Sequence, residues 1–403
     1  MTDTTSETAR AGGTPSEVFR VFLKLGLTSF GGPIAHLGYF RDELVTRRRW
    51  ISESGYADLV ALCQFLPGPA SSQVGLALGL MRGGPLGALA AWIAFTLPSA
   101  LLLIAFGFGA ATIGGPLAGG VLNGLKIVAV AIVAQAVWGM ARSLCPDRER
   151  AAIAVGAIVV VAAMPGAFGQ IGAIALGMIA GLALGRGRGD ALGGGSVAMP
   201  ISRGFGLACL ALFFGLLILL PLVAGQSQTL AVVDAFYRAG ALVFGGGHVV
   251  LPLLETEVVR SGWVSPDDFL AGYGAAQAVP GPLFTFAAFL GTVLQPAPNG
   301  FLGAAIALAA VFAGGFLILL GALPFWDRLR TRPRMQSLMQ GANAAVVGIL
   351  GAALYSPVFT SAIVGLPQFA LAAGCFVLLM AWKCPPWIVV LVAAIGGAAL
   401  TAI

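Results

Sequence analysis

Four short motifs decide the fold of this chain, and they come in two matching pairs: Phe30-Gly31-Gly32-Pro33 with Pro67-Gly68-Pro69, and Phe244-Gly245-Gly246-Gly247 with Pro280-Gly281-Pro282. They divide two apolar regions, 17–82 and 229–294, into shorter arms. As a helix each arm would be roughly 20 Å long, which is shorter than the thickness of a bilayer core. Proline cannot continue a helix. Because irregular backbone at membrane depth must be covered by protein or line a wet cavity, the motifs predict re-entrant hairpins or helices broken at mid-depth.

The two broken regions match one another along the chain. Phe30-Gly31-Gly32 falls on Phe244-Gly245-Gly246 at an offset of 214 residues, and short loop insertions explain a drift of this offset from 213 to 217. Further matched pieces follow in the same order: Lys24 with Arg238, Gln64 with Gln277, Pro67-Gly68-Pro69 with Pro280-Gly281-Pro282, Gly84-Pro85-Leu86-Gly87 with Gly300-Phe301-Leu302-Gly303, and Gly124-Leu125-Lys126 with Gly341-Ala342-Asn343. This order indicates an internal duplication.

The composition places the chain in a membrane. Of the 403 residues, 58% are hydrophobic and only 9% are charged, and the mean hydropathy is +0.95. A soluble domain carries roughly 25% charged residues, so this chain has too few charges to cover a surface in water. Apolar runs of span length are predicted at 84–110, 115–140, 150–185 (two short spans), 203–223, 299–323, 336–354, 357–381 and 385–402.

Other function classes are excluded on composition and motifs. The net charge of +6 would suit nucleic acid, but the 22 basic residues lie in short clusters between apolar runs, as in cytoplasmic membrane loops. The five cysteines form no CxxC pair, and no GxSxG, HExxH or P-loop motif occurs. We therefore expect no enzyme, no cofactor, no metal site and no nucleic-acid partner.

The charge pattern predicts the topology. Basic clusters surround the first broken region, whereas acidic residues flank the second, and a single extra span at 203–223 separates them. By the positive-inside rule the two halves then have opposite orientations, with the N-terminus cytoplasmic and the C-terminus outside. We expect an all-α polytopic membrane protein with two inverted-topology repeats. The predicted parts are a cytosolic tail at 1–15, repeats at 16–185 and 229–403, and a basic Gly-rich linker with the connecting helix at 186–228.

The breaks also predict an anion site. A helix that restarts after such a motif has free N–H groups and the positive end of its dipole at the start, and glycine lets a ligand approach closely. Packing alone is the alternative reason for these breaks. The candidate residues of the breaks are Gly31, Gly32, Gly68, Gly245, Gly246, Gly247 and Gly281, with the nearby hydroxyls Ser71, Ser72 and Thr285 and the amides Gln64 and Gln277.

Isolated charged and titratable residues complete the candidate site. Lys126 lies deep in a predicted span without a nearby acid, so a bound dianion could be its counter-charge, and Asn343 takes its place in the second half. Lys24 and Arg238 either face the site or extend to the headgroups. The two histidines, His36 and His248, follow the FGG motifs and either carry a coupled proton or pack through hydrogen bonds.

The same motifs resemble those of a known family. Phe22-Leu23-Lys24-Leu25-Gly26, the FGG motifs and the PGP motifs in both halves are similar to those of the chromate ion transporter (CHR) family, specifically its long two-domain members. The resemblance covers about residues 17–402. It implies transport of chromate, often as efflux that confers resistance, with sulfate as the look-alike anion.

We therefore predict a secondary transporter of chromate in a bacterial-type inner membrane, working by alternating access around a midplane site. Membrane potential or a proton gradient would drive it, and anionic lipid would contact its basic loops. A sulfate or other anion importer and an anion channel remain open as alternatives on the same fold, and so does a homodimer.

Overall fold

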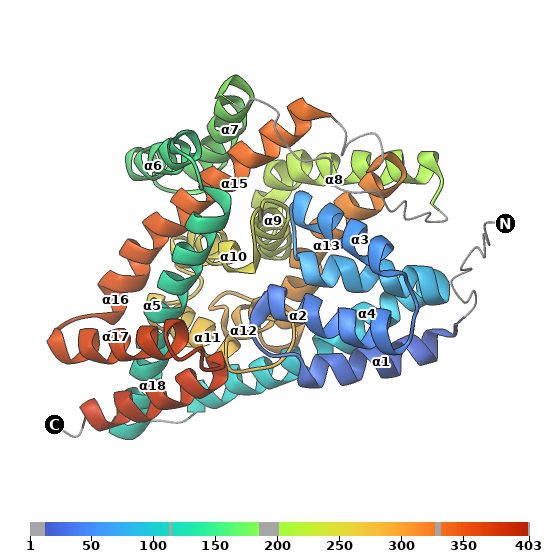
Figure 1. The fold of residues 1–403 in the computed structure, drawn as a ribbon. Coiled ribbons are helices and arrows are strands. Elements are labelled where there is room, and N and C mark those ends of the chain that lie inside the picture. Colours follow the sequence, from blue (N-terminus) through green and yellow to red (C-terminus); the bar gives the residue numbers. More distant parts are fainter. Residues whose placement is uncertain (1–12, 113–114, 185–200, 327–331, 402–403) are drawn as a thin grey trace.

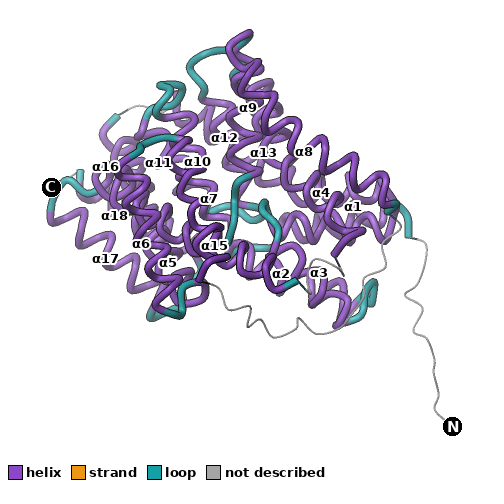
Figure 2. Tube along the Cα trace, turned by 90° about the horizontal axis from the view of Figure 1, so that it is seen from above, coloured by secondary structure: helices purple, strands orange, loops and turns teal. Residues whose placement is uncertain are grey.

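The computed structural model describes residues 13–112, 115–184, 201–326 and 332–401. Its described residues form helices and no strand, as the all-α prediction requires (Figure 2). Most of the predicted tail at 1–15 and nearly all of the linker at 186–202 lie outside the described residues. The chain is thus an all-helical, polytopic membrane protein.

The first half and the connecting segment contain eight α-helices in the described ranges, with one π-helical segment. They are α1 (Pro15–Thr28), α2 (Gly32–Phe40), η1 (Arg41–Arg47), α3 (Glu53–Phe65), α4 (Ala70–Thr112), α5 (Pro116–Leu144), α6 (Arg148–Ala163), α7 (Ala167–Leu184) and α8 (Arg203–Val223), the last followed by the 3-10 turn η2 (Ala224–Gln226).

The second half repeats this order with shorter pieces. Its elements are α9 (Gln228–Ala241), η3 (Gly247–Val249), α10 (Val250–Leu254), η4 (Glu255–Val259), α11 (Pro266–Ala276), η5 (Leu283–Thr285), α12 (Phe286–Val293), α13 (Gly300–Ala322), η6 (Leu323–Phe325), α15 (Pro333–Ala353), η7 (Leu354–Phe359), α16 (Thr360–Ala362), α17 (Leu366–Met380) and α18 (Pro386–Leu400). The π-helical segments η1 and η4 begin at matched positions, Arg41 and Glu255.

Six helical stretches in the described ranges are long and apolar enough to span a membrane: Ala70–Gly109, Leu117–Leu144, Ala167–Leu184, Arg203–Gln226, Gly300–Phe325 and Pro333–Ala362. The span predicted at 357–381 is wrong as a single element. Its first residues belong to the end of the α15 stretch, and a separate 15-residue helix, α17, follows from Leu366. Pro357 and Pro367 explain the break, because neither can donate a backbone hydrogen bond within a helix.

The long element α4 is two helices that fold back on each other. Gly83 and Gly84 leave helical geometry, and the arms before and after them touch: a Cβ on Gly79 would lie 2.5 Å from the carbonyl oxygen of Gly87. In the second half Gly291 and Gly303 make the same kind of contact between α12 and α13. The four half-length arms of the first region are therefore α1, the α2–η1 pair, α3 and the first arm of α4.

The C-terminal helices of each half pack on the other half. Helix α7 packs most extensively on α15 of the second half (Figure 1). In the equivalent contact, α18 packs on α5 of the first half. Glycines permit these approaches, since a Cβ on Gly124 would meet Ala393 of α18 and one on Gly341 would meet Gly177 of α7. Small residues at such crossings let helices pack closely without a hydrophobic driving force. The two halves thus interlock around the broken segments at the centre.

Helix α8 has little cover from the rest of the chain. Only 17% of its most apolar 18-residue stretch is buried. Phe205, Phe214 and Leu222 are among its exposed side chains. It contacts α9 and α13 along one side (Figure 1). An apolar helix exposed in this way suits contact with lipid rather than water.

Candidate anion-binding site

The broken segments of the two halves hold each other by reciprocal hydrogen bonds. The N–H of Gly68 donates to the carbonyl of Val243 at 2.7 Å, and the N–H of Gly281 donates to the carbonyl of Ser29 at 2.9 Å. Gly68 matches Gly281, and Ser29 matches Val243. Each PGP motif is therefore fastened to the residue that precedes the FGG motif of the other half. A pair of contacts in which i meets j and j meets i is the signature of two-fold symmetry.

These bonds correct one sequence prediction. Gly68 and Gly281 are candidate anion-binding residues from the sequence, but their own N–H groups are engaged in joining the two halves. Glycine is required at both places for a different reason. Their φ angles of 120° and 99° lie in the left-handed region, and a Cβ would come within 2.8 Å of Gly315 or of the Ser99 hydroxyl. The two PGP glycines serve close packing at the crossing.

The FGG motifs meet each other as well. A Cβ on Gly247 would lie 3.1 Å from Cγ of Pro33, and these two residues match at the offset of 214. The first FGG motif leads into α2, for which Gly31 is the N-cap with a φ of 100°. The second leads through the 3-10 turn η3 into the five-residue α10. The first therefore starts directly as an α-helix that continues through η1 to Arg47, whereas the second starts as a 3-10 turn and continues through α10 and η4 to Val259.

A cavity of about 300 Å³ opens at the start of α2. It brings together four predicted residues, Gly31, Gly32, His248 and Gln277, from both halves of the chain. Its other lining residues are Ile132 and Gln135 of α5, Leu379 of α17, and residues 383–386, which include Lys383. At roughly 30 Å³ per water molecule, this space accommodates a small anion with part of its hydration shell.

The polar groups of this cavity are suited to an anion. The Nε2 amide of Gln277 is buried and has no hydrogen-bond partner among the described residues. His248 is oriented by a 2.7 Å hydrogen bond between its Nδ1 and the hydroxyl of Tyr273. Lys383 contributes the positive charge of the lining, and the N-terminus of α2 contributes its dipole. We call this site the crossing cavity, lined by Gly31, Gly32, Gln135, His248, Gln277 and Lys383.

The remaining predicted residues near the start of α2 are His36, Ser71 and Ser72, and all three are buried. His36 is fully buried, its Nδ1 lies 3.4 Å from the Ser71 hydroxyl, and its ring stands edge-on to Phe95. Ser72 is buried beside Ser71 in the sequence. In the second half the Thr285 hydroxyl donates to the carbonyl of Pro282 at 2.7 Å, so it stabilises its own break.

Other predicted residues do not reach the crossing cavity. Gln64 is exposed, unlike its match Gln277. Asn343 lies near the second FGG motif, where its Oδ1 is 3.7 Å from a Cβ built on Gly245. Gly246 and Gly247 belong to that motif and lie against Pro33 or open space.

Lys126 has a partner that the sequence did not suggest. Its Nζ lies 3.0 Å from Oδ1 of Asp267, 141 residues away, and the lysine side chain is only 13% exposed. It lines a separate cavity of about 110 Å³ with Asn123, Ser361 and Gln368 among others. A protein carboxylate therefore supplies a counter-charge for Lys126, for which a bound dianion is one possibility from the sequence.

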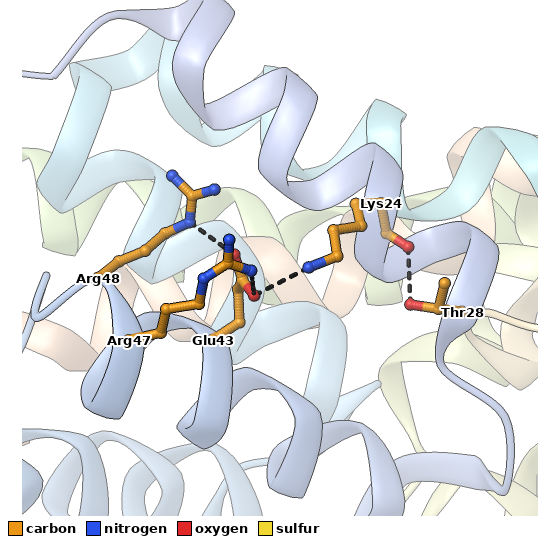
Figure 3. A network of polar contacts seen from close by, with 5 residues as sticks. All are labelled: Lys24, Thr28, Glu43, Arg47 and Arg48. Atoms are coloured by element: carbon orange, nitrogen blue, oxygen red, sulfur yellow. Dashed lines mark hydrogen bonds and ion pairs between the residues drawn. The ribbon is translucent and has the colours of Figure 1, made fainter.

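Lys24 and Arg238 form matched ion pairs instead of facing the cavity. Lys24 Nζ lies 3.1 Å from Glu43, and Arg238 lies 3.1 Å from Glu257, which matches Glu43 at the same offset. Arg47 and Arg48 also reach Glu43, as Figure 3 shows. Arg238 has a second carboxylate, Asp234, where the first half has Arg20.

These two clusters differ in sign. The Lys24 cluster has excess positive charge and borders a cavity of about 310 Å³ that Arg20 also lines, whereas Arg238 is outnumbered by acids. The first cluster therefore carries a net positive charge beside this cavity.

Two polar residues that line the crossing cavity were not predicted from the sequence. Gln135 lies within the apolar run Ala134–Val137 of α5, and Lys383 lies in the short polar break between α17 and α18. An isolated amide in a membrane span was a signal that could have identified Gln135. In the described ranges no group of three or more His, Cys, Asp or Glu side chains could hold a metal ion.

Comparison with known proteins follows the same two-part pattern. The chromate transporter family model matches residues 16–185 and 230–398. The chromate transport protein of Pseudomonas aeruginosa is 31% identical over 98% of this chain and 94% of its own length. A probable chromate transport protein of Synechococcus elongatus is 29% identical over 94% of both chains. The chromate transport protein of Cupriavidus metallidurans is 27% identical over 90% of this chain and 87% of its own length. No solved structure matches significantly.

Proposed function

Because this chain belongs to the chromate transporter family, a family of transporters and not of enzymes, we propose that it exports chromate across the inner membrane as a secondary transporter. The observation that carries the proposal is the crossing cavity. It combines a helix N-terminus, a buried amide N–H without a partner in the described structure, and a lysine. Each of these can donate a hydrogen bond to a tetrahedral oxyanion.

The inverted-repeat topology supports alternating access. We take residues 16–185 and 229–403 as the two repeats, with the linker and α8 at 186–228 between them. The reciprocal Gly68–Val243 and Gly281–Ser29 bonds are equivalent under exchange of the halves, so breaking one and keeping the other produces two related states. Rocking of inverted halves about such a crossing would open the cavity to either side in turn.

Charge favours the outward direction. A divalent anion that leaves an inside-negative cell gains roughly 2.3 kcal/mol per charge per 100 mV. Membrane potential alone can therefore drive export, and a proton gradient is the second source of energy. The excess of basic groups around Lys24, which we place at the cytoplasmic mouth, would concentrate chromate there.

Chromate flux in proteoliposomes that contain only this protein tests the proposal. A membrane potential and then a pH gradient are imposed, and sulfate is added as competitor. We expect saturable chromate flux that responds to the potential. Sulfate flux without chromate flux would show that sulfate, and not chromate, is the substrate. Flux that rises linearly with concentration would indicate a channel.

A further inference from the structure

Six buried polar residues of the first half lie just before the first FGG motif, on α2 and on α4, and two of them, Ser29 and Ser99, lie against Gly281 of the second PGP motif. All are at most 3% exposed. We call them the hydroxyl cluster: Ser29, His36, Ser71, Ser72, Thr96 and Ser99. Five are serine or threonine, and His36 is the one titratable member.

Contacts join the cluster to Gly281 of the other half. The N–H of Gly281 donates to Ser29, and a Cβ on Gly281 would lie 2.8 Å from the Ser99 hydroxyl. The Ser99 hydroxyl in turn donates to the carbonyl of Thr96. His36 contacts Ser71 and the ring of Phe95, which precedes Thr96. Ser29 and Ser99 therefore join the cluster to the crossing, and Gln277 of the cavity lies four residues before Gly281 in the non-helical segment after α11.

Four polar atoms of the cluster lack a hydrogen bond in the described part of the chain: the side-chain oxygens of Ser29, Ser72 and Thr96, and Nε2 of His36. Buried polar groups are normally paired with protein or water, so such a concentration requires an explanation. If the Ser71 hydroxyl donates to Nδ1 of His36, the imidazole proton is on Nε2. The three hydroxyls then offer O–H donors, and the imidazole N–H of His36, which faces the backbone of Ser29, is a fourth donor beside them.

The fold does not need these polar groups, because the second half builds the matched crossing without them. The residues that match Ser29, His36, Ser71, Thr96 and Ser99 are Val243, Val250, Phe284, Phe312 and Gly315. Only Ser72 has a polar match, Thr285, whose hydroxyl is already engaged. Polar groups that are unpaired, buried and confined to one of two equivalent places indicate a ligand rather than packing.

We propose that the hydroxyl cluster is a second, inner binding position for the transported oxyanion, which makes the two halves unequal in function. This inference rests on the proposed function. The anion would leave the crossing cavity between Gln277 and Gly32 and pass the Ser29–Gly281 bond. Its oxygens would then accept from the three hydroxyls and from Nε2 of His36. Neutral donors bind an anion through hydrogen bonds alone and so allow it to leave again.

The test separates this role from a structural one. Thr96→Val and Ser72→Ala each remove an unpaired hydroxyl, so they should leave the melting temperature equal or higher. We expect chromate flux to fall at least tenfold in each variant. Affinity at the crossing cavity should change less than twofold. His36→Gln, which keeps a donor, should retain more flux than His36→Ala.

The matched control is Thr292→Val, which removes a buried hydroxyl that donates to Ala288 at 2.8 Å. We expect lower stability and unchanged flux per folded molecule. Wild-type flux with Thr96→Val and Ser72→Ala would overturn the inner position and leave the proposed function intact. If the wild type itself moves no chromate, equilibrium binding of chromate and sulfate to the purified protein decides: the variants must lower the stoichiometry by one site, and an unchanged stoichiometry overturns the inference.

Discussion

Pro33 and Gly247 occupy the same position in the two halves of the chain, and they contact each other at the centre of the protein. Two equivalent residues touch only where a two-fold axis passes between them. The reciprocal bonds of Gly68 and Gly281 obey the same symmetry, because each joins a PGP motif to the residue before the FGG motif of the other half. The site is therefore built where the halves meet, and not within either half.

A larger side chain at this contact should disturb the crossing. Since a Cβ on Gly247 would lie 3.1 Å from Pro33, Gly247→Val forces the two FGG motifs apart. Overpacking of this kind costs about 1–3 kcal/mol. We expect a lower melting temperature in detergent and reduced chromate flux. Gly374→Ala on α17, where a Cβ meets nothing within 4 Å, is the control and should match the wild type.

The crossing cavity predicts unequal roles for two matched glutamines. Gln277→Ala removes a buried amide that would donate to the anion, and should raise the Kd for chromate about tenfold, or about 1.5 kcal/mol. Gln64→Ala, at the matched but exposed position, should stay within twofold. Equilibrium binding measures both effects. If the two variants changed the Kd equally, the crossing cavity would not be the binding site.

Lys383 gives a second test of the cavity. Lys383→Met removes its positive charge while it keeps the length of the side chain. Because Lys383 is exposed, we expect a moderate rise in the Kd for chromate of about threefold to tenfold that shrinks at high salt. A salt-independent change would point to a packing effect instead.

Lys126 should behave differently from the sequence prediction. Its carboxylate partner Asp267 is 70% exposed, so the pair contributes little to stability. We expect Lys126→Met to cost about 1 kcal/mol or less and to leave the Kd for chromate within twofold. A tenfold loss of chromate affinity would restore the earlier interpretation of Lys126 as an anion ligand.

Opposite orientation of the halves predicts opposite labelling of the matched segments η1 and η4. Thr46 is exposed near the end of η1, and Ser261 is exposed two residues after η4. In a variant without the native cysteines, an impermeant maleimide should label Ser261→Cys in intact cells. Thr46→Cys should react only after permeabilisation. Labelling of both from one side would contradict the inverted topology.

Much of the fold could be predicted from the sequence, because its determinants are local. Proline and glycine break helices wherever they stand, and apolar runs of span length follow from composition alone. The motifs therefore located the half-length arms and indicated the duplication, and the predicted limit between 17–82 and 84–110 coincides with the turn at Gly83–Gly84. The break before α17 was not predicted, although Gly365 and Pro367 stand there, because the run at 357–381 was assigned from its length and its largely apolar composition.

The site depended on contacts that no local pattern contains. The sequence by itself determined a membrane protein with paired helix breaks and an anion-suited chemistry. Tertiary structure decided that Gly68 and Gly281 bind carbonyls of the other half, that Lys126 meets Asp267, and that Gln135 and Lys383 join Gln277. These partners lie far apart along the chain, so their proximity follows from how the interlocked helices pack and not from any single segment.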